Sequence, residues 1–278
     1  MRNGTKIIGI SSGKGGVGKS TLAVNLALAL KKFGKHVTIV DCNLSTPHLS
    51  YYLGTDYYGA TLNDVLLGKA KIQDAIHNYE GIRYIPASLE LKDLVGIELA
   101  KFKSVVKKLS PDTDYIILDS APGLGREAVA VLHAADELLF VATPFVSSIN
   151  DIIRCIDVVK EFGNKKIRIV LNMVSGKRYE LLPETVEEVT GIHVIGIVPF
   201  DIAIVHSLAF GSPVLSYRPD AQASIAFMKL AATMAGAKYK PPNKLEQLFT
   251  RIRNFVYNRG LQIQQGKEVE EEFIIKPQ

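Results

Sequence analysis

The sequence predicts an α/β fold: a doubly wound, mostly parallel β-sheet with helices on both faces. Its apolar runs are short and nearly continuous in Ile, Val and Leu, which is typical of strands buried on both faces. Segments with helical periodicity separate these runs, and this alternation favours parallel strands joined by crossover helices. The chain has 278 residues, of which 47% are apolar and 22% charged, a composition that excludes disordered and fibrous proteins.

The expected elements follow one another along most of the chain. We expect strands at residues 6–11, 36–41, 82–86, 115–119, 137–142, 167–171 and 194–198. We expect helices at residues 19–33, 99–109, 126–134, 149–162, 182–189 and 221–235. Ligands bind at the carboxyl ends of the strands in such sheets, so the residues that follow each strand are the first candidates for a site.

Three regions are expected, because the α/β pattern ends near Gly236. Residues 1–236 are predicted to form the α/β domain. Residues 237–259 are interpreted as a linker, interrupted by two prolines, and a basic amphipathic helix at 244–259. The apolar stripe of this helix consists of Leu245, Leu248, Phe249, Ile252, Phe255 and Val256. Residues 260–278 are interpreted as a polar tail that need not be ordered.

The positive charge is concentrated in the C-terminal segment. The net charge of the chain is +5. Residues 237–266 contain six Lys or Arg and one Glu, so this segment alone has a net charge of +5. The last twelve residues carry −2, which leaves only +2 for residues 1–236. A nearly neutral body argues against a uniformly basic DNA-binding face.

The two cysteines, Cys42 and Cys155, are too few for a disulfide framework, which favours a reducing compartment. Neither an N-terminal signal pattern nor an apolar run long enough to span a bilayer is visible. We therefore expect a cytoplasmic protein, and attachment to a membrane surface stays open because a basic amphipathic helix can lie in the interface.

The strongest motif, Gly-Lys-Gly-Gly-Val-Gly-Lys-Ser at residues 13–20, fits the phosphate-loop pattern G-x-x-x-x-G-K-[ST]. It follows an expected strand and opens an expected helix, whose N-terminus favours anions. Lys19 is expected to reach the β- and γ-phosphates, and the Ser20 hydroxyl to bind Mg²⁺. The predicted nucleotide-binding residues of this segment are Gly13, Gly15, Gly16, Val17, Gly18, Lys19, Ser20 and Thr21.

The generic motif does not require Lys14. With it, the loop resembles the deviant Walker A loop of the MinD/ParA family of ATPases, and the resemblance covers roughly residues 5–236. It implies ATP or ADP and Mg²⁺ as cofactors, and a homodimer formed on ATP in which Lys14 reaches the partner's phosphates. The alternative is a solvated loop lysine. Residues 84–88 and 211–214 resemble segments of the MinD branch.

Two carboxylates complete the expected phosphate site. The strand at 115–119 ends in Asp119, as a Walker B strand does, and the resemblance implies that Gly123 presents its backbone N–H to the γ-phosphate. The family usually has Asp-x-Asp after the second strand, whereas this chain has Asp41 and Asn43. The predicted metal ligands are Ser20, Asp41 and Asp119, and the predicted catalytic residues are Lys14, Lys19, Asp41, Asn43 and Asp119.

Asn43 can accept a hydrogen bond from water but cannot take a proton. Because phosphoryl transfer depends mainly on positioning and electrostatics, we expect intact ATP binding and slow hydrolysis. The alternative is that Asn43 is a turn residue and another group orients the water.

The resemblance also implies a base site. Asn172, after the strand at 167–171, matches an adenine-reading asparagine of the family, and Pro199 and Asp201 match a turn that lines the base pocket. Ordinary turn chemistry is the alternative for each. Tyr51, Tyr52, Tyr57 and Tyr58 follow Asp41 and either pack on the body or contact a partner.

The function expected from the resemblance is that of a MinD-like ATPase, a slow switch for positioning a division site or another complex. Its partners would be a second copy, an unidentified activator or cargo protein, and a membrane surface bound through 244–259. That helix could instead pack on its own body or on a partner. The alternatives are a ParA-like DNA-partitioning ATPase and an ATP-binding scaffold with negligible turnover. Iron–sulfur carriers of this type need paired cysteines, which the sequence does not have.

Overall fold

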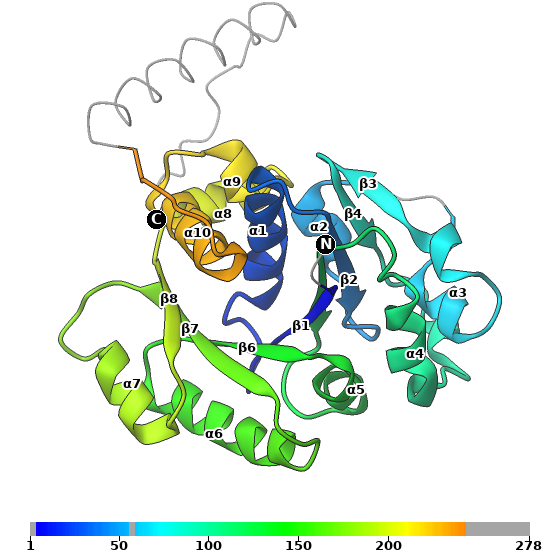
Figure 1. The fold of residues 1–278 in the computed structure, drawn as a ribbon, viewed down its shortest axis with the longest axis horizontal. Coiled ribbons are helices and arrows are strands. Elements are labelled where there is room, and N and C mark those ends of the chain that lie inside the picture. Colours follow the sequence, from blue (N-terminus) through cyan, green and yellow to red (C-terminus); the bar gives the residue numbers. More distant parts are fainter. Residues whose placement is uncertain (1–3, 56–58, 243–278) are drawn as a thin grey trace, which may run out of the picture. The chain divides into compact units, whose positions relative to one another are not determined.

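The computed structural model describes residues 4–55 and 59–242, and an eight-stranded sheet forms its centre (Figure 1). The strands are β1 (Lys6–Ser11), β2 (Val37–Cys42), β3 (His77–Tyr79), β4 (Ile82–Ile85), β5 (Tyr115–Ser120), β6 (Glu137–Ala142), β7 (Lys166–Val174) and β8 (Val194–Pro199). Their order across the sheet is β3-β4-β2-β5-β1-β6-β7-β8, and all neighbours are parallel except β3 and β4. The predicted fold class is confirmed.

Helices connect most of the strands. The α-helices are α1 (Lys19–Lys32), α2 (Leu49–Leu53), α3 (Leu62–Leu66), α4 (Phe102–Lys107), α5 (Arg126–Ala134), α6 (Val146–Lys160), α7 (Pro183–Thr190), α8 (Ile202–Ala209), α9 (Val214–Tyr217) and α10 (Gln222–Ala235). Three short 3₁₀ segments are η1 (Ile72–Ala75), η2 (Leu91–Leu94) and η3 (Leu99–Lys101).

The helices form a layer on each face of the sheet, and α1 and α10 lie together on one of them (Figure 1). Side chains alternate along each strand, so β1 contributes to both cores. Ile8 and Ile10 pack in the core with α1 and α10, whereas Ile7 packs in the core with α5 and α6. Burial on both faces explains why the strands read as continuous apolar runs.

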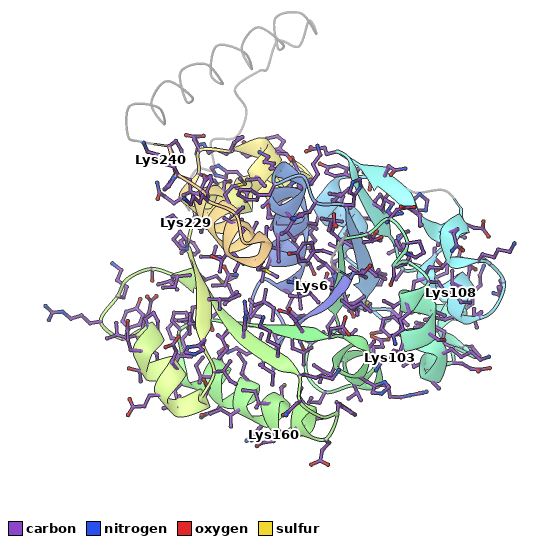
Figure 2. The ribbon with its side chains drawn as sticks, in the orientation of Figure 1. Lys6, Lys103, Lys108, Lys160, Lys229 and Lys240 are labelled. Atoms are coloured by element: carbon purple, nitrogen blue, oxygen red, sulfur yellow. The ribbon has the colours of Figure 1, made fainter. Side chains whose placement is uncertain are left out.

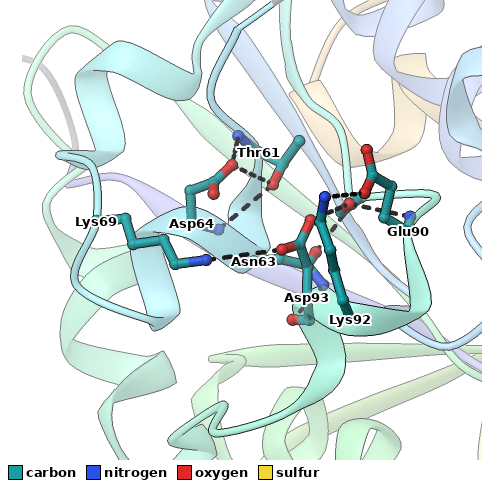
Figure 3. A network of polar contacts seen from close by, with 8 residues as sticks. Thr61, Asn63, Asp64, Lys69, Glu90, Lys92 and Asp93 are labelled. Carbon is teal, nitrogen blue, oxygen red and sulfur yellow. Dashed lines mark hydrogen bonds and ion pairs between the residues drawn. The ribbon is translucent and has the colours of Figure 1, made fainter.

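The segment between β4 and α4 is held to α3 by a polar network (Figure 3). Asn63 Oδ1 accepts the backbone N–H of Ser88 at 2.9 Å, and the Ser88 hydroxyl donates to Asp93 at 2.7 Å. Lys69 approaches the same Asp93 carboxylate at 3.6 Å. Thr61 and Asp64 form a capping box at the start of α3. These contacts hold a long connection against the body.

Several elements differ from the sequence prediction. The antiparallel strand β3 and the short helices α2, α3, α8 and α9 were not expected, and the helix expected at 99–109 divides into η3 and α4. Elements of three to eight residues carry too little periodicity to be recognised from sequence. The expected helix at 244–259, the tail at 260–278, and Tyr57 and Tyr58 lie outside the described residues.

The chain divides into two compact units, the first ending at Tyr239 and the second beginning at Lys240. Within the described residues, no helix is long and apolar enough to cross a membrane.

Candidate nucleotide-binding site

The phosphate loop connects β1 to α1 in an open, glycine-dependent conformation. Gly16 and Gly18 adopt φ angles of +77° and +95°, which L-residues rarely adopt. No described heavy atom lies within 4 Å of the place where a Cβ on Gly15 or Gly16 would stand. Gly18 occupies the N-cap of α1 and brings no side chain to satisfy the first N–H groups. The loop is therefore shaped as an anion-binding nest.

Lys19 lies at the first turn of α1, where its side chain is largely buried. Burial lowers the pKa of its ammonium group, and the nearby Asp119 carboxylate partly opposes this shift. A largely buried cation beside a glycine nest is suited to a phosphate oxygen.

Asp41 and Asp119 are the penultimate residues of two adjacent strands, β2 and β5, and each is only 1% exposed. Asp41 accepts three backbone N–H groups, those of Asn43 at 3.0 Å, His48 at 3.1 Å and Leu49 at 3.0 Å. Asp119 accepts a hydrogen bond from the Ser20 hydroxyl, whereas its Oδ1 has no hydrogen-bond partner within the described part of the chain.

Burial raises the pKa of both carboxyl groups, and for Asp119 the neighbouring Asp41 raises it further. Two buried carboxylates with an unsatisfied oxygen favour a bound cation. Among the described residues there is no cluster of three or more His, Cys, Asp or Glu that could hold a metal. The two carboxylates and the Ser20 hydroxyl are hard oxygen ligands, which fit Mg²⁺, an ion that takes one or two carboxylates together with water and substrate phosphates.

Asn43 is held by its own loop. Its Nδ2 donates to the Thr46 carbonyl at 2.6 Å, and its Oδ1 accepts from the Thr46 hydroxyl at 3.1 Å. Both ends of the amide are engaged, as in an Asx-type turn. In this conformation the amide of Asn43 is engaged by its own loop at both ends.

Glu127, in the first turn of α5, belongs to the site although the sequence analysis missed it. Its carboxylate accepts from the Ser45 hydroxyl at 3.2 Å and from the backbone N–H groups of Leu44 and Ser45. Burial raises the pKa of this group. Glu127 thus connects α5 to the loop after Asp41, and no local motif marks such a contact in advance.

Gly123 contacts the phosphate loop directly. Its φ is +74°, and its N–H donates to the Ser12 carbonyl at 2.9 Å. The Ser12 hydroxyl in turn donates to the Lys14 carbonyl at 2.7 Å. The structure therefore brings Gly123 to the phosphate loop, with its N–H engaged there.

Lys14 lies against its own chain. Its Nζ is 3.3 Å from the Ser147 hydroxyl at the start of α6. Gly13 approaches α6 so closely that a Cβ there would stand 2.2 Å from Asp151 Cβ. This exposed hydrogen bond to Ser147 holds Lys14 only weakly.

Asn172 packs on the phosphate loop. Its Nδ2 donates to the Val17 carbonyl at 2.7 Å, and its buried Oδ1 has no partner among the described residues. A Cβ on Gly18 would stand 2.2 Å from Asn172 Nδ2, so Gly18 is needed for this contact. The next residue, Met173, has φ +59°, within a register shift of β7 against β8.

Pro199 ends β8, and Asp201 serves as a helix cap. Asp201 Oδ1 accepts the N–H of Ala203 in α8 at 2.9 Å, and its Oδ2 accepts that of Ala223 in α10 at 3.1 Å. Both carboxylate oxygens are therefore engaged in capping, which favours ordinary turn chemistry over a direct contact with a base.

The two described tyrosines after Asp41 differ. Tyr51 is 61% exposed, while Tyr52 packs against the core and hydrogen bonds Thr21 of α1. Packing on the body is thus observed for Tyr52, and Tyr51 leaves an aromatic ring in solvent.

Comparison with known proteins identifies the family. A family model described as ParA, a NUBPL iron-transfer P-loop NTPase, matches residues 3–235. The chain belongs to the ParA family of P-loop NTPases. The resemblance noted in its phosphate loop is confirmed.

Individual relatives of this ParA-family chain include archaeal and bacterial proteins. An uncharacterized ATP-binding protein of Methanocaldococcus jannaschii is 38% identical over 234 residues, which cover 84% of this chain and 89% of that protein. The septum site-determining protein MinD of Thermotoga maritima is 31% identical over 241 residues, covering 83% and 88%. MinD of Pyrococcus horikoshii, solved with Mg-ADP, has a TM-score of 0.79 at 32% identity and covers 83% of this chain and 96% of its own.

Proposed function

We propose that this ParA-family protein binds ATP with Mg²⁺ and acts as a MinD-like switch for spatial positioning. The observation that carries the proposal is the buried pair Asp41 and Asp119, with one unsatisfied carboxylate oxygen close to Lys19 and the glycine nest. Ser20, Asp41 and Asp119 would hold the metal. When bound, Mg²⁺ supplies positive charge that neutralises these carboxylates and the phosphates.

The base is proposed to be adenine. The unpartnered Oδ1 of Asn172 can accept a hydrogen bond, which suits the exocyclic amino group of adenine and not the carbonyl oxygen of guanine. Pro199 and Asp201 are proposed to shape the pocket through the backbone that they fix.

The ATP-bound form is proposed to be a homodimer. Lys14 would leave Ser147 and reach the phosphates bound by the second copy. Breaking one exposed hydrogen bond costs little, so the lysine is available for that contact. Gly123 would exchange the Ser12 carbonyl for the γ-phosphate, which links the phosphate loop to the segment after β5.

Hydrolysis is proposed to be slow. The Asn43 amide is neither acidic nor free, because Thr46 holds both of its ends. An ATP-binding scaffold with negligible turnover is the limiting case of the same proposal. Iron transfer is not proposed, because Cys42 and Cys155 are buried and far apart in sequence.

The output is proposed to be positioning of a division site or another complex in the cytoplasm. An unidentified activator or cargo protein would read the nucleotide state, as the solved MinC:MinD complex of Aquifex aeolicus illustrates for that relative. In this proposal residues 1–236 form the ATPase domain, 237–259 a linker and membrane-binding helix, and 260–278 a tail.

Calorimetry of the full chain with ATP, ADP and GTP in the presence of Mg²⁺ tests nucleotide binding. We expect one adenine nucleotide to bind per chain and GTP to bind more weakly. Lys19→Ala should lose the binding of adenine nucleotides and of GTP. Absence of heat with ATP would contradict the proposal.

A further inference from the structure

A cavity lies at the amino ends of the strands, whereas the phosphate loop lies at their carboxyl ends. Its volume is about 560 Å³, and its walls come from β1, β5, β6, β7, the end of α10 and the loop after α1. Lys6 begins β1 while the phosphate loop follows the end of that strand, a separation of about 17 Å at 3.3 Å per residue. The cavity is therefore separate from the nucleotide site.

The cavity exists because the α1–α10 layer ends before the sheet does. Lys6 continues the row of Ile8 and Ile10, whose side chains pack in the core with α1 and α10. In β7, Arg168 precedes the core residue Val170 by two residues, as Lys6 precedes Ile8 in β1. Because side chains alternate along a strand, Lys6 and Arg168 lie on this same face of the sheet. Charged side chains thus replace apolar ones where helix cover stops.

Positive charge dominates the cavity wall, which carries Lys6, Lys35, Lys166 and Arg168 against two acids. The two acids leave the wall with a net charge of +2. Asp114 accepts the backbone N–H of His36 at 2.7 Å, and Glu137 pairs with Lys166 at 3.7 Å.

Lys6, Lys35 and Arg168 form no ion pair within the described part of the chain, while the Asp114 carboxylate keeps its charge in the same wall. The Lys6 ammonium stands 5.8 Å from the ring centre of Tyr115, whose hydroxyl donates to the Met234 carbonyl at 2.9 Å. Lys35 and Arg168 are half-buried. Lys6 is exposed, so the half-buried Lys35 and Arg168 are the cations that gain most from a bound anion.

We propose that this cavity binds a small, multiply charged anion that carries a phosphate group. A wall with a net charge of +2 matches a phosphate or diphosphate better than a single carboxylate, and the planar guanidinium of Arg168 suits two phosphate oxygens at once. The volume lies within the range of small-ligand pockets, about 300–1,000 Å³. The site is independent of the proposed nucleotide site and of what binds there.

Pyrophosphate, titrated into the full chain by calorimetry without Mg²⁺, tests this proposal. Because the phosphate loop can also bind the probe, the titration is run in the Lys19→Ala background. We expect binding to persist there, and Arg168→Gln or Lys35→Gln in the same background to weaken it about 10- to 100-fold.

Lys108→Gln is the matched control, because it removes one positive charge beside α4, away from Lys6 at the start of β1 (Figure 2). It is expected to leave the affinity unchanged. A thermal unfolding curve like that of the parent shows that each variant is folded. Loss of all pyrophosphate binding in Lys19→Ala, or equal affinity in Arg168→Gln and its parent, would overturn the proposal, and the cavity would then be a solvated sheet edge.

Discussion

Asp41 and Asp119 are paired in register on the adjacent parallel strands β2 and β5, both nearly inaccessible to solvent. Two carboxylates placed together in this way cost stability unless a cation lies with them. Lys19 supplies one positive charge and the Ser20 hydroxyl one hydrogen bond. The site therefore lacks positive charge, which a divalent ion can supply. The nucleotide-free protein thus keeps a costly arrangement at its binding site.

Replacing Asp119 with Asn is expected to stabilise the nucleotide-free protein. The amide has the shape of the carboxyl group without its charge, so at pH 7.5 the free energy of unfolding should rise by about 1–3 kcal/mol. Urea unfolding followed by circular dichroism measures this change. The same variant should lose Mg²⁺-dependent ATP binding, and a less stable variant would show that Asp119 is not strained.

The stability gap between Asp119→Asn and the wild type should widen with pH. The pKa of Asp119 is raised to about 7 and that of Asp41 to about 6, above the ordinary value near 3.9 in the unfolded chain. The folded chain therefore holds these protons more tightly than the unfolded chain. The stabilisation that the folded wild type gains from holding these two protons is complete below about pH 4. It is lost as pH rises through 6 and 7, where the two carboxyl groups ionise. Unfolding curves at pH 4.5, 6 and 7.5 measure the gap, and a constant gap would argue against the raised values.

Lys14→Ala is expected to abolish the ATP-dependent dimer while leaving the monomer folded. Within the described part of the chain its ammonium forms one exposed hydrogen bond, to the Ser147 hydroxyl, so little stability is lost. Light scattering after gel filtration, with ATP and with ADP, measures the mass. Ser147→Ala is the matched control, because it removes the same hydrogen bond but keeps the charge. A dimer that persists in Lys14→Ala would remove the proposed role of this residue.

Asn43→Asp is expected to raise ATP turnover about tenfold. The carboxylate cannot donate to the Thr46 carbonyl, so the loop contact at 2.6 Å is lost and an acidic group becomes available near the site. Steady-state phosphate release measures the rate. Thr46→Val serves as the control, since it removes the hydroxyl contact without adding charge. An unchanged rate in Asn43→Asp would show that another residue orients the water.

Met173→Gly is expected to raise the free energy of unfolding by about 1 kcal/mol relative to Met173→Ala. Both variants remove the side chain, but only glycine accepts φ +59° without strain. Nucleotide affinity should remain the same in both if the bulge keeps Asn172 on the Val17 carbonyl. Chemical denaturation measures the difference in stability between the two variants, and ATP titration compares their nucleotide affinities. Equal stabilities would mean that the position carries no strain.

Local sequence patterns predict several elements of the protein correctly. The strands β1 and β6 and the helix α5 begin and end where the periodicity indicated, and the Gly13–Ser20 motif follows β1 and runs into the first turn of α1 as expected. Contacts between distant segments could not be predicted. Nothing in the local sequence indicates that Glu127 accepts from Ser45, because that contact depends on how α5 packs beside the loop after β2.

The same limit applies to residues whose type fits several roles. Asp201 resembles a base-pocket residue by its place after β8, but its oxygens cap α8 and bond to Ala223 of α10. The basic cavity at the amino ends of the strands has no motif at all. It depends on Arg168 and Lys6 lying on one face where α10 has ended, which only the tertiary structure reveals.

The most direct test of the account is the effect of Mg²⁺ on ATP affinity in the wild type and in Asp119→Asn. We expect Mg²⁺ to tighten ATP binding to the wild type by at least about tenfold, and to have no effect in the variant. Wild-type affinity that does not respond to Mg²⁺, or a response that persists in Asp119→Asn, would contradict the assignment of the buried carboxylates as the metal site.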